Sequence, residues 1–170
     1  MFGRSRKVPA DLRPQLDRDE RVLSWAPSEP SGAVVVTDRG VWLPGHERLG
    51  WHQIHKATWA NPRLTVIPST QVGEGQGYAV MADGSPVVVL LDRPDDVPAD
   101  VRTRVTRSVA YTAHYPLPGG GVRVVARRIP GHNGVAWHVR YDEGTDRDDP
   151  EVVEATTAIV AEASAPDPTL

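Results

Sequence analysis

Short apolar runs separated by turn residues fill the first half of the chain, and this alternation limits its fold more than any other feature. The clearest case is the β-branched run 33–37, which is followed by Asp38-Arg39-Gly40 and then by a second apolar run from Val41. Valine and threonine favour strands, and Asp and Gly supply the dihedrals of tight turns. This segment therefore predicts a β-hairpin.

The same pattern predicts seven strands before residue 92. They are expected at residues 21–25, 33–37, 41–43, 48–59, 64–67, 78–81 and 86–91. The last two flank Ala-Asp-Gly-Ser and are expected to form a hairpin, whereas the glycine-rich segment 69–77 is expected to be a loop. The 16 prolines and 15 glycines agree with many turns and few long helices.

The period changes after residue 96. Valine recurs every fourth residue, at Val97, Val101, Val105 and Val109. This spacing puts the four side chains on one face of a helix, which Asp95 or Asp96 can cap and which stops before Pro116. A further hairpin is predicted from 122–129 and 135–141, and a last helix begins at Pro150 behind the acids Asp148 and Asp149.

Three stretches of this order resemble a known family. They are similar to sequence motifs of bacterial pleckstrin-homology-like (PH-like) domains. The stretches are 20–23 (Glu-Arg-Val-Leu), 33–41 (Ala-Val-Val-Val-Thr-Asp-Arg-Gly-Val) and 49–54 (Leu-Gly-Trp-His-Gln-Ile). The resemblance covers roughly residues 20–114. The whole chain also resembles small uncharacterised actinobacterial proteins.

The resemblance implies a mainly β fold with α elements, a PH-like split seven-stranded barrel capped by a helix. A β-hairpin and a last helix would extend it. The expected organisation is a flexible N-terminal arm at 1–19, the PH-like domain at 20–114, an extension packed on it at 115–164 and a frayed tail at 165–170. Such domains serve binding or assembly. The first hairpin loop, 27–32, carries Glu29 and no Lys or Arg, so classical phosphoinositide binding is not expected.

Residues with recognisable chemistry are sparse, and we predict no catalytic, metal-binding or cofactor-binding residue. The chain has no cysteine, which excludes thiolate zinc sites and cysteine nucleophiles. His52 and His55 would point to opposite faces of one strand. No secretory leader, lipidation motif or apolar run long enough to span a bilayer is recognisable, so we expect a cytoplasmic protein.

Charge is unevenly distributed along the sequence. Residues 97–141 carry seven arginines and one acid, whereas residues 142–170 carry nine acids and one arginine. A basic segment can bind anions, and an acidic one beside it can mask it. In the other reading the two segments simply pack on each other, or both are solvated. The candidate anion-binding residues are Arg102, Arg104, Arg107, Arg123, Arg127, Arg128 and Arg140.

Five tryptophans are more than a small core usually needs. They either fill the core and seal the added hairpin or mark an interface, for which Trp42, Trp59 and Trp137 are the candidate residues. The leading functional hypothesis is therefore a non-enzymatic protein-interaction or assembly module that binds an unknown protein or itself. The alternative is an anion binder, for nucleic acid or an anionic membrane, whose basic segment the acidic C-terminus masks. An enzyme of unrecognised class is the third reading.

Overall fold

The computed structural model describes residues 7–168, and the fold within this range is mainly β. The chain divides into two compact units. The first contains the residues up to Ser69 together with 83–108 and 129–132, and the second contains 70–82, 109–128 and the residues from Asn133 onward. Neither unit is one contiguous segment, whereas the sequence predicts contiguous domains, because strand pairing and not chain order decides which residues pack together.

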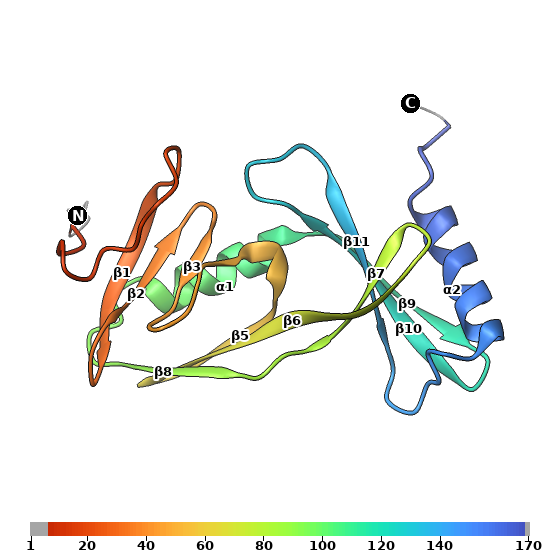
Figure 1. Cartoon of the computed structure of the whole chain (residues 1–170), viewed down its shortest axis with the longest axis horizontal. Coiled ribbons are helices and arrows are strands. Elements are labelled where there is room, and N and C mark those ends of the chain that lie inside the picture. The colour runs from red at the N-terminus through yellow and green to blue at the C-terminus, as the bar shows by residue number, and fades with distance from the viewer. Residues whose placement is uncertain (1–6, 169–170) are drawn as a thin grey trace. The chain divides into compact units, whose positions relative to one another are not determined.

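The first unit is built on antiparallel strands (Figure 1). They follow the order β4-β3-β2-β1-β8-β6, with β5 on the other side of β6. The elements are β1 Val22–Glu29, β2 Ala33–Thr37, β3 Gly40–Trp42, β4 Leu49–Gly50, the 3-10 turn η1 Trp51–Gln53, β5 Ile54–Ala60, the first part of β6 Arg63–Gly75, β8 Val87–Leu91 and α1 Val97–Ser108.

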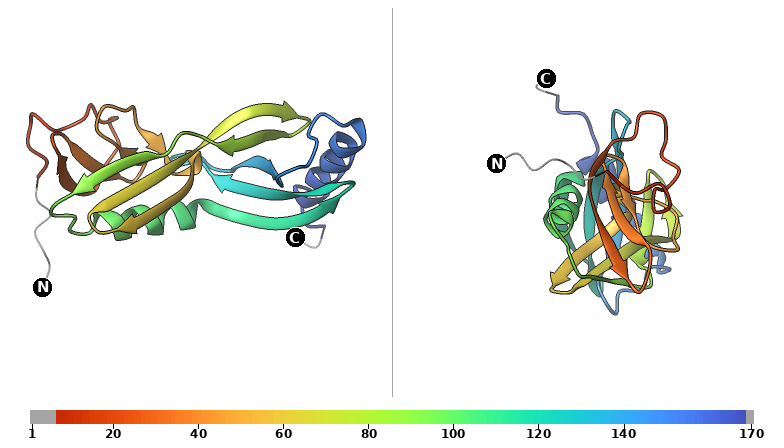
Figure 2. Two further views of the ribbon diagram at one scale, coloured as in Figure 1. Left: turned by 90° about the horizontal axis from the view of Figure 1, so that it is seen from below. Right: turned by 90° about the vertical axis from the view of Figure 1, so that its left-hand side faces the viewer.

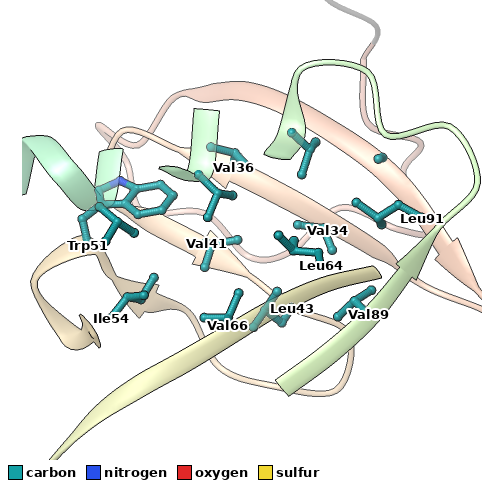
Figure 3. Packing of buried hydrophobic residues seen from close by; sticks show 14 residues of the cluster. Val34, Val36, Val41, Leu43, Trp51, Ile54, Leu64, Val66, Val89 and Leu91 are labelled. Carbon is teal, nitrogen blue, oxygen red and sulfur yellow. The ribbon is translucent and has the colours of Figure 1, made fainter. Parts of the chain in front are cut away.

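One apolar cluster fills this unit. Val34 and Val36 lie on one face of β2 and meet Leu64 of β6 and Leu91 of β8 (Figure 3), whereas Val35 is buried outside this cluster. The four side chains that meet in the cluster are fully buried. Because residues from distant strands share one cluster, the sheet must curl so that its two ends face the same core.

Helix α1 completes this core. Its stripe Val97, Val101 and Val105 is buried in the cluster, as the four-residue spacing predicts. The helix contacts β1, β2, β5 and η1, and the right-hand view of Figure 2 shows it beside the strands of this unit.

The second unit holds the end of β6 and four more elements in the sheet order β6-β7-β11-β10-β9. These are β7 Tyr78–Asp83, β9 Val109–Leu117, β10 Gly120–Arg128 and β11 Val135–Tyr141, followed by α2 Pro150–Ala163. β10 pairs antiparallel with β9 and β11, and β7 pairs parallel with β11. The predicted hairpin and last helix are confirmed.

Helix α2 covers one face of this sheet. Val152 and Val160 pack with Val122, Val124 and Val139 in a second core cluster. The carboxylate of Asp149 accepts the Glu151 N–H at the N-terminus of the helix, as expected for an acid that precedes Pro150.

The prediction that Val109 continues the first helix is wrong. The Ser108 hydroxyl donates to the Val105 carbonyl where α1 ends, and β9 begins at Val109. Alternate residues of β9, including Tyr111 and Tyr115, then turn toward the second core. A period of two with aromatic residues outweighs one extra valine at helical spacing.

The predicted loop 69–77 and the hairpin 78–91 are also wrong. β6 continues through the glycines to Gly75 and turns at Gly77, whose φ is 85°. A Cβ on Gly75 would lie 2.1 Å from the ring of Tyr78, so the missing side chain makes room for that ring. β7 therefore pairs with β6 and β11, and β8 pairs with β1 and β6.

The predicted strand 48–59 is interrupted by η1. The side chain of Gln53 accepts the Gly50 N–H at 2.8 Å, which satisfies the backbone where the strand stops. The N-terminal segment that precedes β1 contacts this unit, since Asp17 accepts a hydrogen bond from Arg48 at 2.9 Å. Of the expected arm and tail, residues 1–6 and 169–170 lie outside the described residues.

Candidate anion-binding surface

Three basic side chains stand in one row across three adjacent strands of the second unit. Arg123 of β10 is directly opposite Arg140 of β11 on one side and opposite His114 of β9 on the other. Side chains in such positions have Cβ atoms about 5 Å apart. We call His114, Arg123 and Arg140 the basic row. Arg123 and Arg140 were predicted from the sequence, and the register brings them together.

The basic row lies on the sheet face opposite to helix α2. Val122 and Val124 flank Arg123 in β10 and belong to the cluster that packs with α2. Successive side chains of a strand point to opposite faces, so Arg123 points away from the helix. The acidic helix therefore does not lie over the row, although the sequence allowed it as a mask.

One acid from the C-terminal segment does reach this surface. The His114 ring nitrogen Nε2 lies 2.8 Å from the Asp142 carboxylate, and both side chains are about half exposed. The pair lies over Gly121, where a Cβ would be 2.4 Å from the carboxylate and 2.8 Å from the ring. Asp142 thus offsets the charge of a protonated His114.

Arg123 keeps its charge available to solvent. It is exposed, and its Nη1 donates to the Thr112 hydroxyl at 3.1 Å. Among the residues that the structure describes, Arg123 makes no ion pair. Its guanidinium is thereby positioned by a neutral group and can still bind an anion.

Arg127 lies four residues along β10 on the same face and is buried, with 7% of its surface exposed. Burial, and then the positive charge of Arg140, lower the pKa of Arg127. Both causes oppose the charged form of Arg127.

The other predicted arginines do not join this row. Arg128 points to the other sheet face and donates to the Val109 carbonyl at 3.0 Å. Arg102, Arg104 and Arg107 lie on α1 in the first unit, where Arg102 and Arg107 are exposed and line an open hollow on the helix surface. The seven arginines therefore divide into two sets, one in each unit.

The candidate interface tryptophans have structural contacts. The Trp42 indole donates to Glu20 and lies 5.8 Å from the Arg48 guanidinium carbon. Trp59 packs against the first core and Trp137 against the second, where its ring centroid is 5.7 Å from that of Tyr111. All three are only partly exposed, so each contributes to packing.

The side chain of Glu20 connects several residues of the segment 20–54, which carries the family resemblance. Its carboxylate accepts hydrogen bonds from the Thr37 hydroxyl at 2.7 Å, the Trp42 indole at 3.0 Å and the Asp17 N–H at 3.0 Å. It also pairs with Arg48. Burial alone would raise the pKa of Glu20, but these hydrogen bonds and the charge of Arg48 outweigh burial and lower it.

Thr37 extends this network to the β2–β3 turn. Its hydroxyl also accepts the backbone N–H groups of Arg39 and Gly40, and its carbonyl accepts the Trp51 indole at 3.1 Å. The residues quoted for the family resemblance thus stabilise the fold around one buried carboxylate.

Comparisons with protein-family models, with curated proteins and with solved structures found no match. Within residues 7–168, no three His, Asp or Glu side chains gather as they would around a metal ion. His52 lies in η1 and His55 in β5, where His55 is 3.6 Å from Asp83. No helix in the described range is long and apolar enough to cross a membrane.

His114 is the member of the row that sequence reasoning missed. The available signal was the alternation of Tyr111, Ala113 and Tyr115 with Thr112 and His114, which predicts a strand with His114 on its outward face.

Proposed function

We propose that this chain is a non-enzymatic, cytoplasmic binding module whose basic row binds the phosphate backbone of a nucleic acid. The observation that carries the proposal is the register of His114, Arg123 and Arg140, three basic side chains in directly opposed positions. Like charges directly opposite each other on a sheet are destabilising. A polyanion bound across the strands would bring its phosphates to the guanidinium groups of Arg123 and Arg140.

The composition of this face favours contacts to phosphates over contacts to bases. Its central positions hold Thr112, Val125 and His138 in register between Arg127 and the basic row. Stacking of bases requires aromatic side chains on the binding face, and the tyrosines of β9 belong to the opposite, core face. Binding through phosphates is independent of sequence and falls steeply with salt.

We further propose that the first unit has a PH-like framework. The antiparallel order of its strands, the curled core closed by α1 and the network of Glu20, Thr37 and Trp51 support this proposal. In such a framework the first unit supplies stability, and the second unit supplies the anion-binding face.

The double variant Arg123→Gln/Arg140→Gln tests the function. We expect the full chain to bind a fluorescent single-stranded or duplex oligonucleotide at low salt, and the double variant to bind at least about tenfold more weakly. The slope of log K against log salt should decrease in magnitude by about 1.4 to 1.8, because each of the two lost phosphate contacts contributes about 0.7 to 0.9.

The matched control is Arg102→Gln/Arg107→Gln, which removes the same charge from exposed positions of α1. It should keep most of the affinity. Equal losses in the two double variants would show that net charge alone governs binding, and this would refute a site at the basic row. Binding to anionic vesicles that exceeds binding to the oligonucleotides would replace nucleic acid by a membrane as the partner.

Exposed apolar residues of β8 favour protein binding as a second candidate function. Val88 is 53% exposed and Leu90 is 40% exposed. They alternate with the buried Val89 and Leu91 and thus share the outward face of the strand. If this face binds a second copy of the chain, sedimentation should show a concentration-dependent dimer, which Val88→Asp should abolish. A monomer at all concentrations would exclude self-association.

A further inference from the structure

A polar hollow in the first unit is separate from the basic row. It has a volume of about 390 Å³. Its wall comes from four places in the chain: Asp17, the β2–β3 turn, residues 48–53 and the loop 129–132. All of them belong to the first unit. The side chains that matter here are Arg39, Arg48, His52, Gln53 and His132, with Asp17 at the edge.

Arg39 is one of two arginines that line this hollow. It is partly buried, and its guanidinium lies against the backbone of Gly131, where a Cβ would come within 1.8 Å of Nη1. Within the described residues, the side chain of Arg39 makes neither an ion pair nor a hydrogen bond. A partly desolvated guanidinium has five donors to satisfy, and water satisfies them less well here than at an open surface.

Arg48 is already neutralised. Its Nη1 donates to Asp17 at 2.9 Å and pairs with the buried Glu20. Asp17 is the acid that also lines the hollow, and this contact commits it to Arg48. Asp17 and Glu20 carry two negative charges against the one positive charge of Arg48, and within the described residues neither carboxylate forms an ion pair with Arg39.

Neutral donors accompany Arg39. The Gln53 side chain uses its oxygen to accept the Gly50 N–H at 2.8 Å, which leaves its NH₂ group as a donor. His132 is exposed on the loop beside Pro130 and can donate from either ring nitrogen. Donors that come from separate segments approach one ligand from different directions.

We propose that this hollow binds a small phosphate-bearing anion, with Arg39 as the principal ligand residue. A phosphate group has oxygens that point in several directions and can accept from several walls at once, and arginine binds it in a bidentate manner. The volume lies at the lower end of the range for small-molecule sites. The proposal does not depend on the basic row, which lies in the other unit.

Calorimetric titration of the full chain with inorganic phosphate and pyrophosphate tests this site. We expect saturable binding to the wild type and a loss of about tenfold or more in Arg39→Gln, because a charge-assisted contact is removed. Arg63→Gln is the matched control, since Arg63 is exposed in the same unit and does not line the hollow. It should bind as the wild type does.

A second variant moves Arg39 without changing charge. Gly131→Ala places a Cβ where the guanidinium lies, so it should also weaken phosphate binding, and thermal unfolding will show whether the fold persists. Absence of saturable binding to the wild type, or unchanged binding in Arg39→Gln, would overturn the proposal. Equal binding of acetate would overturn the assignment to phosphate. Arg123→Gln/Arg140→Gln should leave this binding intact.

Discussion

Replacing Glu20 by alanine is expected to lower the free energy of unfolding by about 3 kcal/mol, because it removes the acceptor of a buried network. The Thr37 hydroxyl, the Trp42 indole and the Arg48 guanidinium would all lose the carboxylate that they share. Urea unfolding followed by tryptophan fluorescence measures the change, since Trp42 reports on the network directly.

Glu29→Ala is the matched control, because Glu29 is exposed at the end of β1. It should change stability by less than about 0.5 kcal/mol. If the two variants lose equal stability, the network around Glu20 is not what holds these strands together.

The same carboxylate predicts a pH dependence with a definite sign. The pKa of Glu20 is lower in the folded chain than in the unfolded chain, so the unfolded state binds the proton more readily. The stabilisation that the ionised Glu20 carboxylate provides is fully present above the unfolded-state pKa of about 4.3. It is lost as the pH falls through the pKa of the folded state. The stability difference between wild type and Glu20→Gln should therefore shrink below about pH 4. A difference that is constant with pH would contradict the lowered pKa.

Gly40→Ala is expected to destabilise the chain by about 3 kcal/mol or more, because it forces backbone apart. A Cβ at residue 40 would lie 2.1 Å from the Leu49 carbonyl oxygen and 3.0 Å from the Gly50 Cα. Gly40 pairs with Gly50 across β3 and β4, so no side-chain movement can remove the clash. Chemical denaturation measures the loss.

Gly73→Ala is the control for Gly40→Ala. Gly73 also lies within a strand, but a Cβ there would meet Val80 at an ordinary 3.7 Å. This variant should stay within about 1 kcal/mol of the wild type. Comparable losses at both positions would mean that strand glycines act through chain entropy and that the contact with Leu49 is unimportant.

Local sequence predicted the regular elements where one signal dominated. The valines at 97, 101 and 105 form the buried stripe of α1, Pro150 begins α2, and 122–129 and 135–141 form a hairpin. The alternation in β11 also placed Arg140 and His138 on one face, which the register confirms. In each case the residue type and its period agree, and packing reinforces the local preference.

Local sequence failed where pairing with a distant segment decided the outcome. The glycines at 73 and 75 suggested a loop, but β7 and the ring of Tyr78 make them part of a long strand. Val109 kept the helical spacing, yet pairing with β10 turned it into the first residue of β9. Long-range hydrogen bonds and burial outweigh propensities that differ by about 1 kcal/mol or less.

The sequence by itself therefore determined a mainly β chain with two helices, and it placed arginines on the face of a hairpin. Only the tertiary structure could add His114 to Arg123 and Arg140, because the register between β9 and β10 is fixed by the packing of one sheet face. Only the tertiary structure could likewise bring Arg39 to Gly131, across more than ninety positions of the chain. Residues so far apart in sequence are joined by core packing, which acts through space and leaves no local signal.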